Sequence, residues 1–233
     1  MLFIVGLGNP GREYASHRHN VGFMAVDELC GHVNAEAFRD KFSGSYARAS
    51  IAGEQAVLLK PMTYMNESGR SIQPAMAFFK AKPSELLIIH DELDLPFGDV
   101  RLKFGGGHAG HNGLRSAMAH VGTGEFGRLR IGIGRPPPGF RGEVADYVLS
   151  SFDPIERASL PDCLKTAVQS VIEIAARGFE AAMKSRNTRL KPAKTKPKVD
   201  AEGDTKSPQA KTEGTPSSLR SKSSGAKGQE ENQ

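Results

Sequence analysis

Apolar and polar positions follow two different periods along residues 1–189. The run Leu2-Phe3-Ile4-Val5 is apolar throughout, which predicts a buried first strand. Apolar residues then recur at helical spacing over 19–33. A second continuous run, 86–91, is apolar until it ends in His90-Asp91, which predicts a strand in the middle of a sheet covered by helices.

The same periods place the remaining elements. Further strands are expected over 44–52, 55–60, 100–104 and 128–134, and further helices after Gly69, after Gly113 and over 160–183. Gly53-Glu54 is expected to form a hairpin turn, and Asn66 or Ser68 to cap the helix after Gly69. Pro161 is expected in the first turn of the last helix or at an early break. This alternation predicts an α/β fold, a single domain with a mixed, twisted sheet between helices.

Residues 190–233 differ from the rest in composition. They contain no aromatic residue, and nine Lys or Arg and six Asp or Glu are dispersed among Ser, Pro, Gly and Gln. Such a segment cannot bury enough apolar surface to offset its chain entropy. We therefore expect a folded domain over 1–189 and a disordered basic tail over 190–233, more easily read as a solvated appendage than as an RNA-binding arm.

The net charge argues against a uniformly basic surface. The chain carries a formal charge of +5, of which the tail holds +3 (9 − 6) and the rest +2 (22 − 20). Any nucleic-acid partner is therefore expected to meet local basic patches.

Cysteine usage and hydropathy indicate the compartment. Cys30 and Cys163 lie in apolar, helical surroundings and are interpreted as buried free thiols. No apolar run approaches the roughly 18 residues of a membrane span, and no charged leader or signal segment precedes the first strand. A cytoplasmic protein without a membrane partner is expected.

The loop Gly6–Gly22 is the densest concentration of functional residue types. It holds Asn9, His17 and His19 among several glycines, directly after the first strand. The spacing Gly-x-Gly-x-x-Gly matches the motif of dinucleotide-binding folds, which requires a helix to begin at these glycines, and no helical pattern begins there. The motif also requires an acidic residue at the end of a second strand about twenty residues on, and the acid near that position, Glu28, lies within a helical pattern. We reject a dinucleotide site.

A metal site is the second alternative. His17-x-His19, His90-Asp91 and His108-x-x-His111 supply enough ligands, but none has the spacing of a helical zinc motif and no cysteine pairs occur. No metal or cofactor is therefore assigned.

Hydrolysis by a general base accounts better for the same residues. A carboxylate such as Asp91 can fix the tautomer of a histidine such as His19 and leave its other nitrogen free to take a proton from water. Loop amides such as Asn9, Asn66 and Asn112 can hold a peptide backbone or an ester carbonyl, although each of them could equally be a loop former or a helix cap.

Five ordered motifs resemble the bacterial peptidyl-tRNA hydrolases over about residues 1–187. These are Gly6-Leu-Gly-Asn-Pro-Gly11 with Tyr14 and His19-Asn20-Val-Gly22, then Lys60-Pro-Met-Thr-Tyr-Met-Asn-Glu-Ser-Gly69, His90-Asp-Glu-Leu-Asp-Leu-Pro96, Gly105-Gly-Gly-His-Ala-Gly-His-Asn-Gly-Leu114 and Arg128-Leu-Arg-Ile-Gly-Ile-Gly134. The resemblance implies an enzyme that hydrolyses the ester between a peptide and the 3′-terminal ribose of tRNA, recycling the tRNA. It also implies a cytoplasmic monomer that needs no cofactor.

The resemblance also implies a role for each matched residue. His19 matches the general base, Asp91 the carboxylate that orients it, and Asn9 the residue that distinguishes peptidyl from free aminoacyl esters. Substrate-binding positions are matched by Tyr14, Tyr64, Met65, Asn66 and Asn112. Lys103 and Arg130 match the basic residues that hold the tRNA 5′-phosphate, a contact that positions the RNA without reading its sequence.

One segment departs from the motifs, and one rival function is kept. Arg135-Pro-Pro-Pro-Gly139 lies just beyond the last motif, at the expected rim of the site. The rival is a non-catalytic RNA-binding module of the same fold, which would be indicated by loss of His19, Asp91 or an asparagine. All of them are present.

Overall fold

The structure is a computed structural model that describes residues 1–189. The predicted tail, 190–233, lies outside the described residues. Within them, a seven-stranded sheet has the order β2-β3-β4-β1-β5-β7-β6. The strands are β1 (Leu2–Gly6), β2 (Arg39–Lys41), β3 (Gly44–Ile51), β4 (Glu54–Pro61), β5 (Leu86–Glu92), β6 (Val100–Phe104) and β7 (Gly127–Gly132).

The sheet is mixed, as predicted. β1 pairs in parallel with β4 and β5, and β5 pairs in parallel with β7. The pairs β2–β3, β3–β4 and β6–β7 are antiparallel. The carboxyl ends of β1, β4, β5 and β7 therefore meet at one edge of the sheet, and the loops that leave these ends can share a site.

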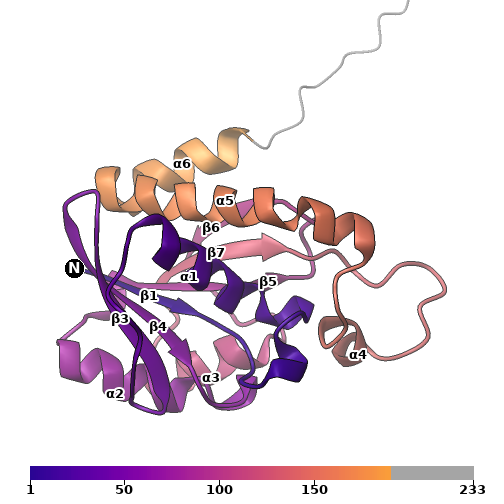
Figure 1. Ribbon diagram of the computed structural model, residues 1–233, viewed down its shortest axis with the longest axis horizontal. Helices are drawn as coiled ribbons and strands as arrows, with labels where there is room; N and C mark the ends of the chain where they lie inside the picture. Colours follow the sequence, from indigo (N-terminus) through magenta and orange to yellow (C-terminus); the bar gives the residue numbers. More distant parts are fainter. Residues whose placement is uncertain (190–233) are drawn as a thin grey trace, which may run out of the picture. The chain divides into compact units, whose positions relative to one another are not determined.

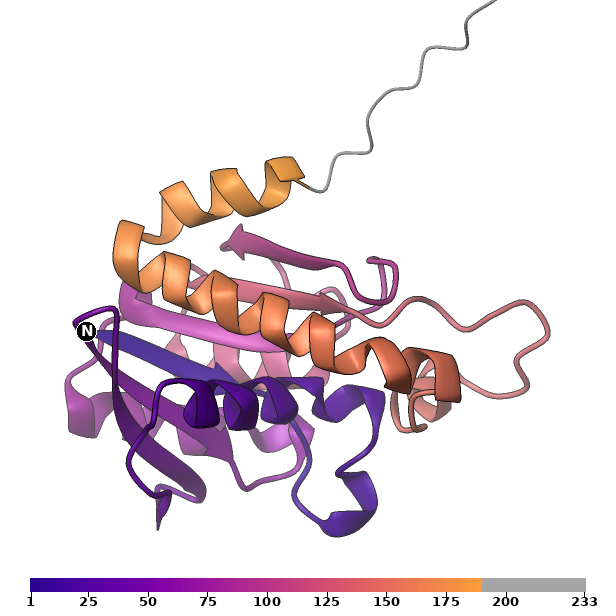
Figure 2. The same ribbon diagram turned by 45° about the horizontal axis from the view of Figure 1, so that its top comes forward.

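Helices cover both faces of the sheet, with α1, α5 and α6 on one face and α2 and α3 on the other (Figures 1 and 2). The helices are α1 (Val21–His32), α2 (Gly69–Phe79), α3 (Asn112–Val121), α4 (Val144–Val148), α5 (Pro154–Arg177) and α6 (Phe179–Arg189). Short 3₁₀ turns precede α1 at Arg18–Asn20 and α2 at Met65–Glu67; two others are Arg12–Tyr14 and Pro83–Glu85.

The two layers give two hydrophobic cores. In β1, Ile4 packs into the core under α1 and α5, whereas Phe3 and Val5 pack into the core under α2 and α3. Successive strand side chains point to opposite faces, so a strand buried on both faces is apolar at every position. Full burial of each such side chain contributes on the order of 1.5–3 kcal/mol.

The single helix predicted over 160–183 is wrong, because two helices occupy this region. α5 begins earlier, at Pro154, where the carboxylate of Asp153 accepts two backbone N–H bonds and caps the helix. Gly178 ends α5 with φ +83°, a conformation that favours glycine, and α6 follows. Pro161 was expected in the first turn of the helix or at a break. It lies inside α5, because the helix begins earlier and Pro154 takes the first position.

Smaller differences have local causes. The hairpin turn between β3 and β4 falls at Ala52-Gly53, one residue before the predicted place, and Glu54 already belongs to β4. Ser68 stands at the N-cap of α2, but its Oγ donates to the carbonyl of Met65 instead of capping the helix. The short elements β2 and α4 were not predicted.

The edge of the sheet at β6 is closed by a side chain of α6. The backbone N–H of Leu102 donates to Asn187 Oδ1 at 3.1 Å, and Asn187 Nδ2 donates to the Leu102 carbonyl at 2.9 Å. One amide thus satisfies both backbone groups of Leu102 on the open side of the strand, which hinders pairing with another chain at this position.

Cys30 and Cys163 are free thiols, half-buried and buried. Burial, together with a nearby aspartate in each case, raises the pKa of both thiols to about 11, so both are weak nucleophiles. No helix among residues 1–189 is long and apolar enough to cross a membrane.

Candidate active site

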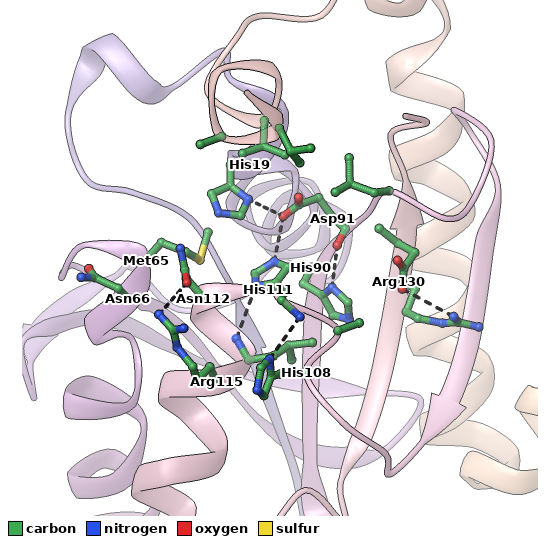
Figure 3. A pocket seen from close by; sticks show the side chains of 18 of the residues that line it. His19, Met65, Asn66, His90, Asp91, His108, His111, Asn112, Arg115 and Arg130 are labelled. Carbon is green, nitrogen blue, oxygen red and sulfur yellow. Dashed lines mark hydrogen bonds and ion pairs between the residues drawn. The ribbon is translucent and has the colours of Figure 1, made fainter. Parts of the chain in front are cut away.

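A cavity of about 770 Å³ opens at the carboxyl edge of the sheet and gathers the loops expected to meet there. The residues predicted for the site all line it: Asn9, Tyr14, His19, Tyr64, Met65, Asn66, Asp91, Lys103, Asn112 and Arg130. They come from six separate stretches of chain, so the fold brings together what the sequence spaces apart (Figure 3).

His19 and Asp91 form the expected pair. His19 Nδ1 lies 2.8 Å from Asp91 Oδ1, and both residues are buried. Since an ionised carboxylate only accepts hydrogen bonds, Nδ1 carries the proton and His19 Nε2 keeps a free lone pair. The geometry leaves one basic nitrogen for a water molecule in the cavity.

The positive charge of a protonated His19 and the negative charge of Asp91 stabilise one another. Burial lowers the pKa of His19, but the charge of Asp91 and the hydrogen bond to it outweigh burial and raise that pKa above its ordinary value. Burial raises the pKa of Asp91, but His19 and His111 beside it hold that pKa well below its usual range. Asp91 therefore stays ionised, and His19 is the member of the pair that can take up a proton.

His111 is a member of this cluster that sequence reasoning considered only as a metal ligand. Its Nε2 donates to Asp91 Oδ1 at 3.0 Å, and its Nδ1 accepts from the N–H groups of Gly113 and Leu114 at 3.1 and 3.3 Å (Figure 3). His111 thus caps α3 and orients Asp91 in a single neutral tautomer. No spacing in the sequence could have shown this double contact.

His90 packs beneath the cluster. Its ring lies edge-on to that of His111 with centroids 5.0 Å apart, and its Nδ1 donates to the backbone carbonyl of Asp91 at 2.7 Å. Burial, together with His111, lowers the pKa of His90 to about 3, so this ring stays neutral. His90 is placed to support the backbone of Asp91 and not to transfer protons.

The three ligand atoms of His19, Asp91 and His111 all lie within 4.8 Å of one another, which is a possible metal triad. The two histidine nitrogens, however, are 2.8 and 3.0 Å from the same carboxylate oxygen, the lengths of N–H···O bonds. Those nitrogens would have to lose their protons to bind an ion. The donor set fits a hydrogen-bonded cluster better than a metal centre.

Asn9 is held by its neighbours in one orientation. Its backbone N–H and carbonyl both bond to the amide of Asn20 at 2.9 Å, and its Oδ1 accepts from the N–H of Met65 at 2.8 Å. Because Oδ1 is occupied, the Nδ2 donors are the groups of Asn9 that can meet a substrate carbonyl. Asn20, the clamp of Asn9, was not predicted as a site residue.

The other predicted substrate contacts surround this centre. Asn112 is the first residue of α3, and its Oδ1 accepts from Arg115 at 2.8 Å, which again leaves its Nδ2 as a donor (Figure 3). Asn66 and Tyr64 are exposed at the rim, and Tyr14 is half-buried. These side chains are placed to bind an extended substrate.

Three of the basic residues that line the pocket, Lys103, Arg128 and Arg130, lie on β6 and β7, whereas Arg115 lies on α3 and Arg135 follows β7. Lys103 is exposed and forms no ion pair with any residue among 1–189, whereas Arg130 lies 3.5 Å from Glu92. Strand register places Lys103 opposite Arg128 and Arg101 opposite Arg130. We call these four residues the cationic face; only Lys103 and Arg130 were predicted.

An apolar wall formed by α4 was also missed. Val144, Val148 and Leu149 line the cavity, and α4 packs against the turn that carries His19. Buried Arg18, next to His19, holds the two together: it donates to Ser150 Oγ at 2.7 Å and pairs with Glu156. No residue near Arg18 in the sequence indicates that it is buried, because its partners lie far along the chain.

The proline segment that departs from the motifs forms part of the rim. Residues 135–139 contain neither helix nor strand, and Arg135 pairs with Asp94. Phe140 packs edge-on to Tyr147, with ring centroids 5.6 Å apart. The segment is thus anchored at both ends between β7 and α4.

Comparison with known proteins gives the same result at the level of sequence and of structure. The family model described as peptidyl-tRNA hydrolase matches residues 3–196. A peptidyl-tRNA hydrolase of Sorangium cellulosum is 72% identical over 214 residues, 92% of this chain and 96% of the relative. One of Methylocella silvestris is 47% identical over 186 residues, 80% of this chain and 93% of the relative.

A solved structure agrees with the fold. The crystal structure of peptidyl-tRNA hydrolase from Acinetobacter baumannii is 42% identical and superposes with a TM-score of 0.74, covering 80% of this chain and 94% of that chain.

Proposed function

The chain belongs to the peptidyl-tRNA hydrolase family, and we propose that His19 and Asp91 perform the hydrolysis of peptidyl-tRNA in its pocket. The activity follows from the family. The observation that carries the mechanism is the 2.8 Å contact between His19 Nδ1 and Asp91 Oδ1, which leaves His19 Nε2 free inside the cavity.

The chemistry balances with water as the only co-reactant. Nε2 of His19 takes a proton from water while the water oxygen attacks the ester carbonyl carbon. The bond from that carbon to the ribose oxygen then breaks, and the ribose oxygen takes the proton back from His19. The products are a tRNA with a free 3′-terminal hydroxyl and a peptide with a new carboxyl group, which releases its proton to the solvent and becomes a carboxylate. Positioned bases of this kind contribute about 10²–10⁴-fold in rate.

Recognition is divided among the surrounding groups. The Nδ2 donors of Asn9 and Asn112 bind carbonyl oxygens of the peptide, and the rim residues Tyr14, Tyr64 and Asn66 bind the peptide and the tRNA 3′ end. Met65 is buried and forms an apolar part of the wall. Lys103 and Arg130 bind the tRNA 5′-phosphate. Asn9 donates to the amide carbonyl on the blocked amino group of the substrate. A free aminoacyl ester has no such carbonyl.

The test is turnover of N-acetyl-aminoacyl-tRNA by His19→Ala, with exposed His32→Ala as a matched control. We expect loss of turnover with tRNA affinity kept in the first variant, and unchanged turnover in the second. Activity of His19→Ala within a few-fold of the unaltered protein would contradict the assignment. The same assay with a chelator tests whether the reaction needs a metal ion. We expect unchanged turnover, and loss of turnover would show a metal requirement. Failure of the unaltered protein to turn over would favour the RNA-binding module.

We also propose that the enzyme acts as a monomer in the cytoplasm. A single copy of the chain can supply the whole proposed site, because all of the predicted residues line one pocket. Sedimentation at assay concentration should give the mass of one chain, and a larger species with higher specific activity would contradict this proposal.

A further inference from the structure

The cationic face places like charges in direct opposition. Lys103 faces Arg128 and Arg101 faces Arg130 across the β6–β7 ladder. Like charges opposite each other on a sheet are destabilising. Asp99 lies 3.3 Å from Arg101 and Glu92 lies 3.5 Å from Arg130, but no carboxylate among residues 1–189 lies within ion-pair distance of Lys103 or Arg128. The unfavourable arrangement is offset when a polyanion binds.

Arg128 differs from the other three cations because it is buried and its guanidinium is bonded to backbone carbonyls. It is only 2% exposed, and its guanidinium lies 5.1 Å from the ring centroid of Phe126. Nη1 donates to the carbonyl of Gly107 at 2.6 Å, and Nη2 donates to the carbonyls of Gly106 and Gly124. Its two Nη atoms are thus bonded to Gly106 and Gly107 in the glycine loop that precedes α3, and to Gly124 after α3.

The glycine loop in turn touches Lys103. Gly106 has φ +97°, and a methyl group placed on it would meet Lys103 Nζ at 3.0 Å and Cε at 3.1 Å. The end of the Lys103 side chain therefore lies against the backbone that Arg128 holds. A continuous set of contacts leads from the buried guanidinium through the loop to the exposed ammonium.

We propose that Arg128 is a positioning residue for phosphate binding, which fixes the glycine loop and through it the place of the Lys103 ammonium. The inference rests on the proposed role of Lys103 toward the tRNA 5′-phosphate. An arginine suits this task because its planar guanidinium bonds two successive carbonyls in a fixed geometry, whereas the ammonium of a lysine is a single centre on a flexible chain.

The experiment compares N-acetyl-aminoacyl-tRNA that carries a 5′-phosphate with the same RNA after phosphatase treatment. One charge-assisted bond gives an expected preference of about tenfold in KM for the phosphorylated substrate. Arg128→Lys should lose most of this preference with kcat kept on both substrates. Arg157→Lys is the matched control, because Arg157 also donates to a backbone carbonyl but lies outside the cavity. It should keep the preference.

Two further variants test whether Arg128 acts through Lys103. In a Lys103→Ala background, Arg128→Lys should change KM by less than about twofold, because residues in one contact network are not additive. Gly106→Ala disturbs the same contacts from the other side and should reproduce the loss of preference with Arg128 intact. Gly106→Ala therefore tests whether the glycine loop positions Lys103 even if Arg128→Lys does not fold.

The outcomes separate the two proposals. If the unaltered protein shows no preference for the 5′-phosphate, the role of Lys103 is wrong. If it shows the preference but both Arg128→Lys and Gly106→Ala retain it, only the role of Arg128 is wrong. Equal loss of kcat on both substrates, or fully additive effects in the double variant, would also overturn the positioning role.

Discussion

The two ends of the pocket treat charge in opposite ways. Around Asp91, one carboxylate accepts from two histidines, and Asn9 and His111 are held by several bonds each. On the cationic face, four positive side chains oppose one another and Lys103 has no partner among residues 1–189. The hydrogen bonds of the first end are formed within the protein, whereas at the second end only Arg101 and Arg130 have a carboxylate partner in the described part of the chain, which leaves an excess of positive charge. Chemistry and tRNA binding are therefore expected to be separable by mutation.

The largest expected effect is at the end around Asp91. His19→Ala removes the base and should lower the single-turnover rate by about 10²–10⁴-fold with tRNA affinity unchanged. Parallel measurement of RNA binding and turnover checks this. A variant that lost affinity and rate together would show that the two ends are not independent.

Asp91→Asn should lower the rate by about 10²-fold or more, because the amide no longer fixes the tautomer of His19. It also changes the pH profile. Only neutral His19 is a base, so the rate falls as pH drops through the pKa of His19, which Asp91 raises. Without that charge, burial lowers the pKa, and the acid limb of log kcat against pH should move to lower pH. An unmoved limb would mean that Asp91 does not set the basicity of His19.

Asn9→Ala should narrow the preference for N-acetyl-aminoacyl-tRNA over free aminoacyl-tRNA by about tenfold, the value of one hydrogen bond to substrate. The ratio of kcat/KM for the two substrates measures it. Asn34→Ala, a change to an exposed loop asparagine outside the cavity, serves as the control. Unchanged discrimination by Asn9→Ala would remove this role.

At the cationic end, Lys103→Ala and Arg130→Ala should raise KM by about tenfold while kcat changes little. Each should also reduce the slope of log affinity against log salt by about one, because one phosphate contact is lost. A fall in kcat at constant KM would instead place these residues in the chemistry.

The smallest effect concerns stability and contrasts the ends most sharply. Lys103→Gln removes a charge opposite Arg128 and should raise the free energy of unfolding at low salt by about 0.5 kcal/mol. His19→Ala leaves a buried carboxylate with one donor fewer and should lower it by about 1–3 kcal/mol. Urea titrations of both variants measure the two changes in the free energy of unfolding. Changes of the same sign would contradict the difference between the two ends of the pocket.

Much of this molecule could be predicted from its sequence where the information is local. The strands β1 and β5 begin as apolar runs; His19 lies in the stretch that follows β1, and Asp91 lies near the carboxyl end of β5 itself. The break at Gly178 was missed because the apolar spacing continues across it from α5 into α6, and only a positive φ reveals the turn.

The parts that could not be predicted depend on distant partners. The burial of Arg18 depends on the fold, because its partners Ser150 and Glu156 lie more than a hundred residues further along the chain. The opposition of Lys103 and Arg128 depends on strand register, which a shift of one residue would abolish. The motifs therefore predicted residues that line one pocket, whereas the side chains that hold these residues in place, and the ion pairs around them, depend on the fold.

The most direct test of separable ends is the single-turnover rate of N-acetyl-aminoacyl-tRNA hydrolysis as a function of enzyme concentration. The plateau gives the rate of chemistry and the half-saturation point gives the affinity, in one curve. We predict that His19→Ala lowers the plateau without moving the midpoint, and that Lys103→Ala moves the midpoint without lowering the plateau. If both variants change both quantities to the same extent, the pocket is one coupled unit and the account is wrong.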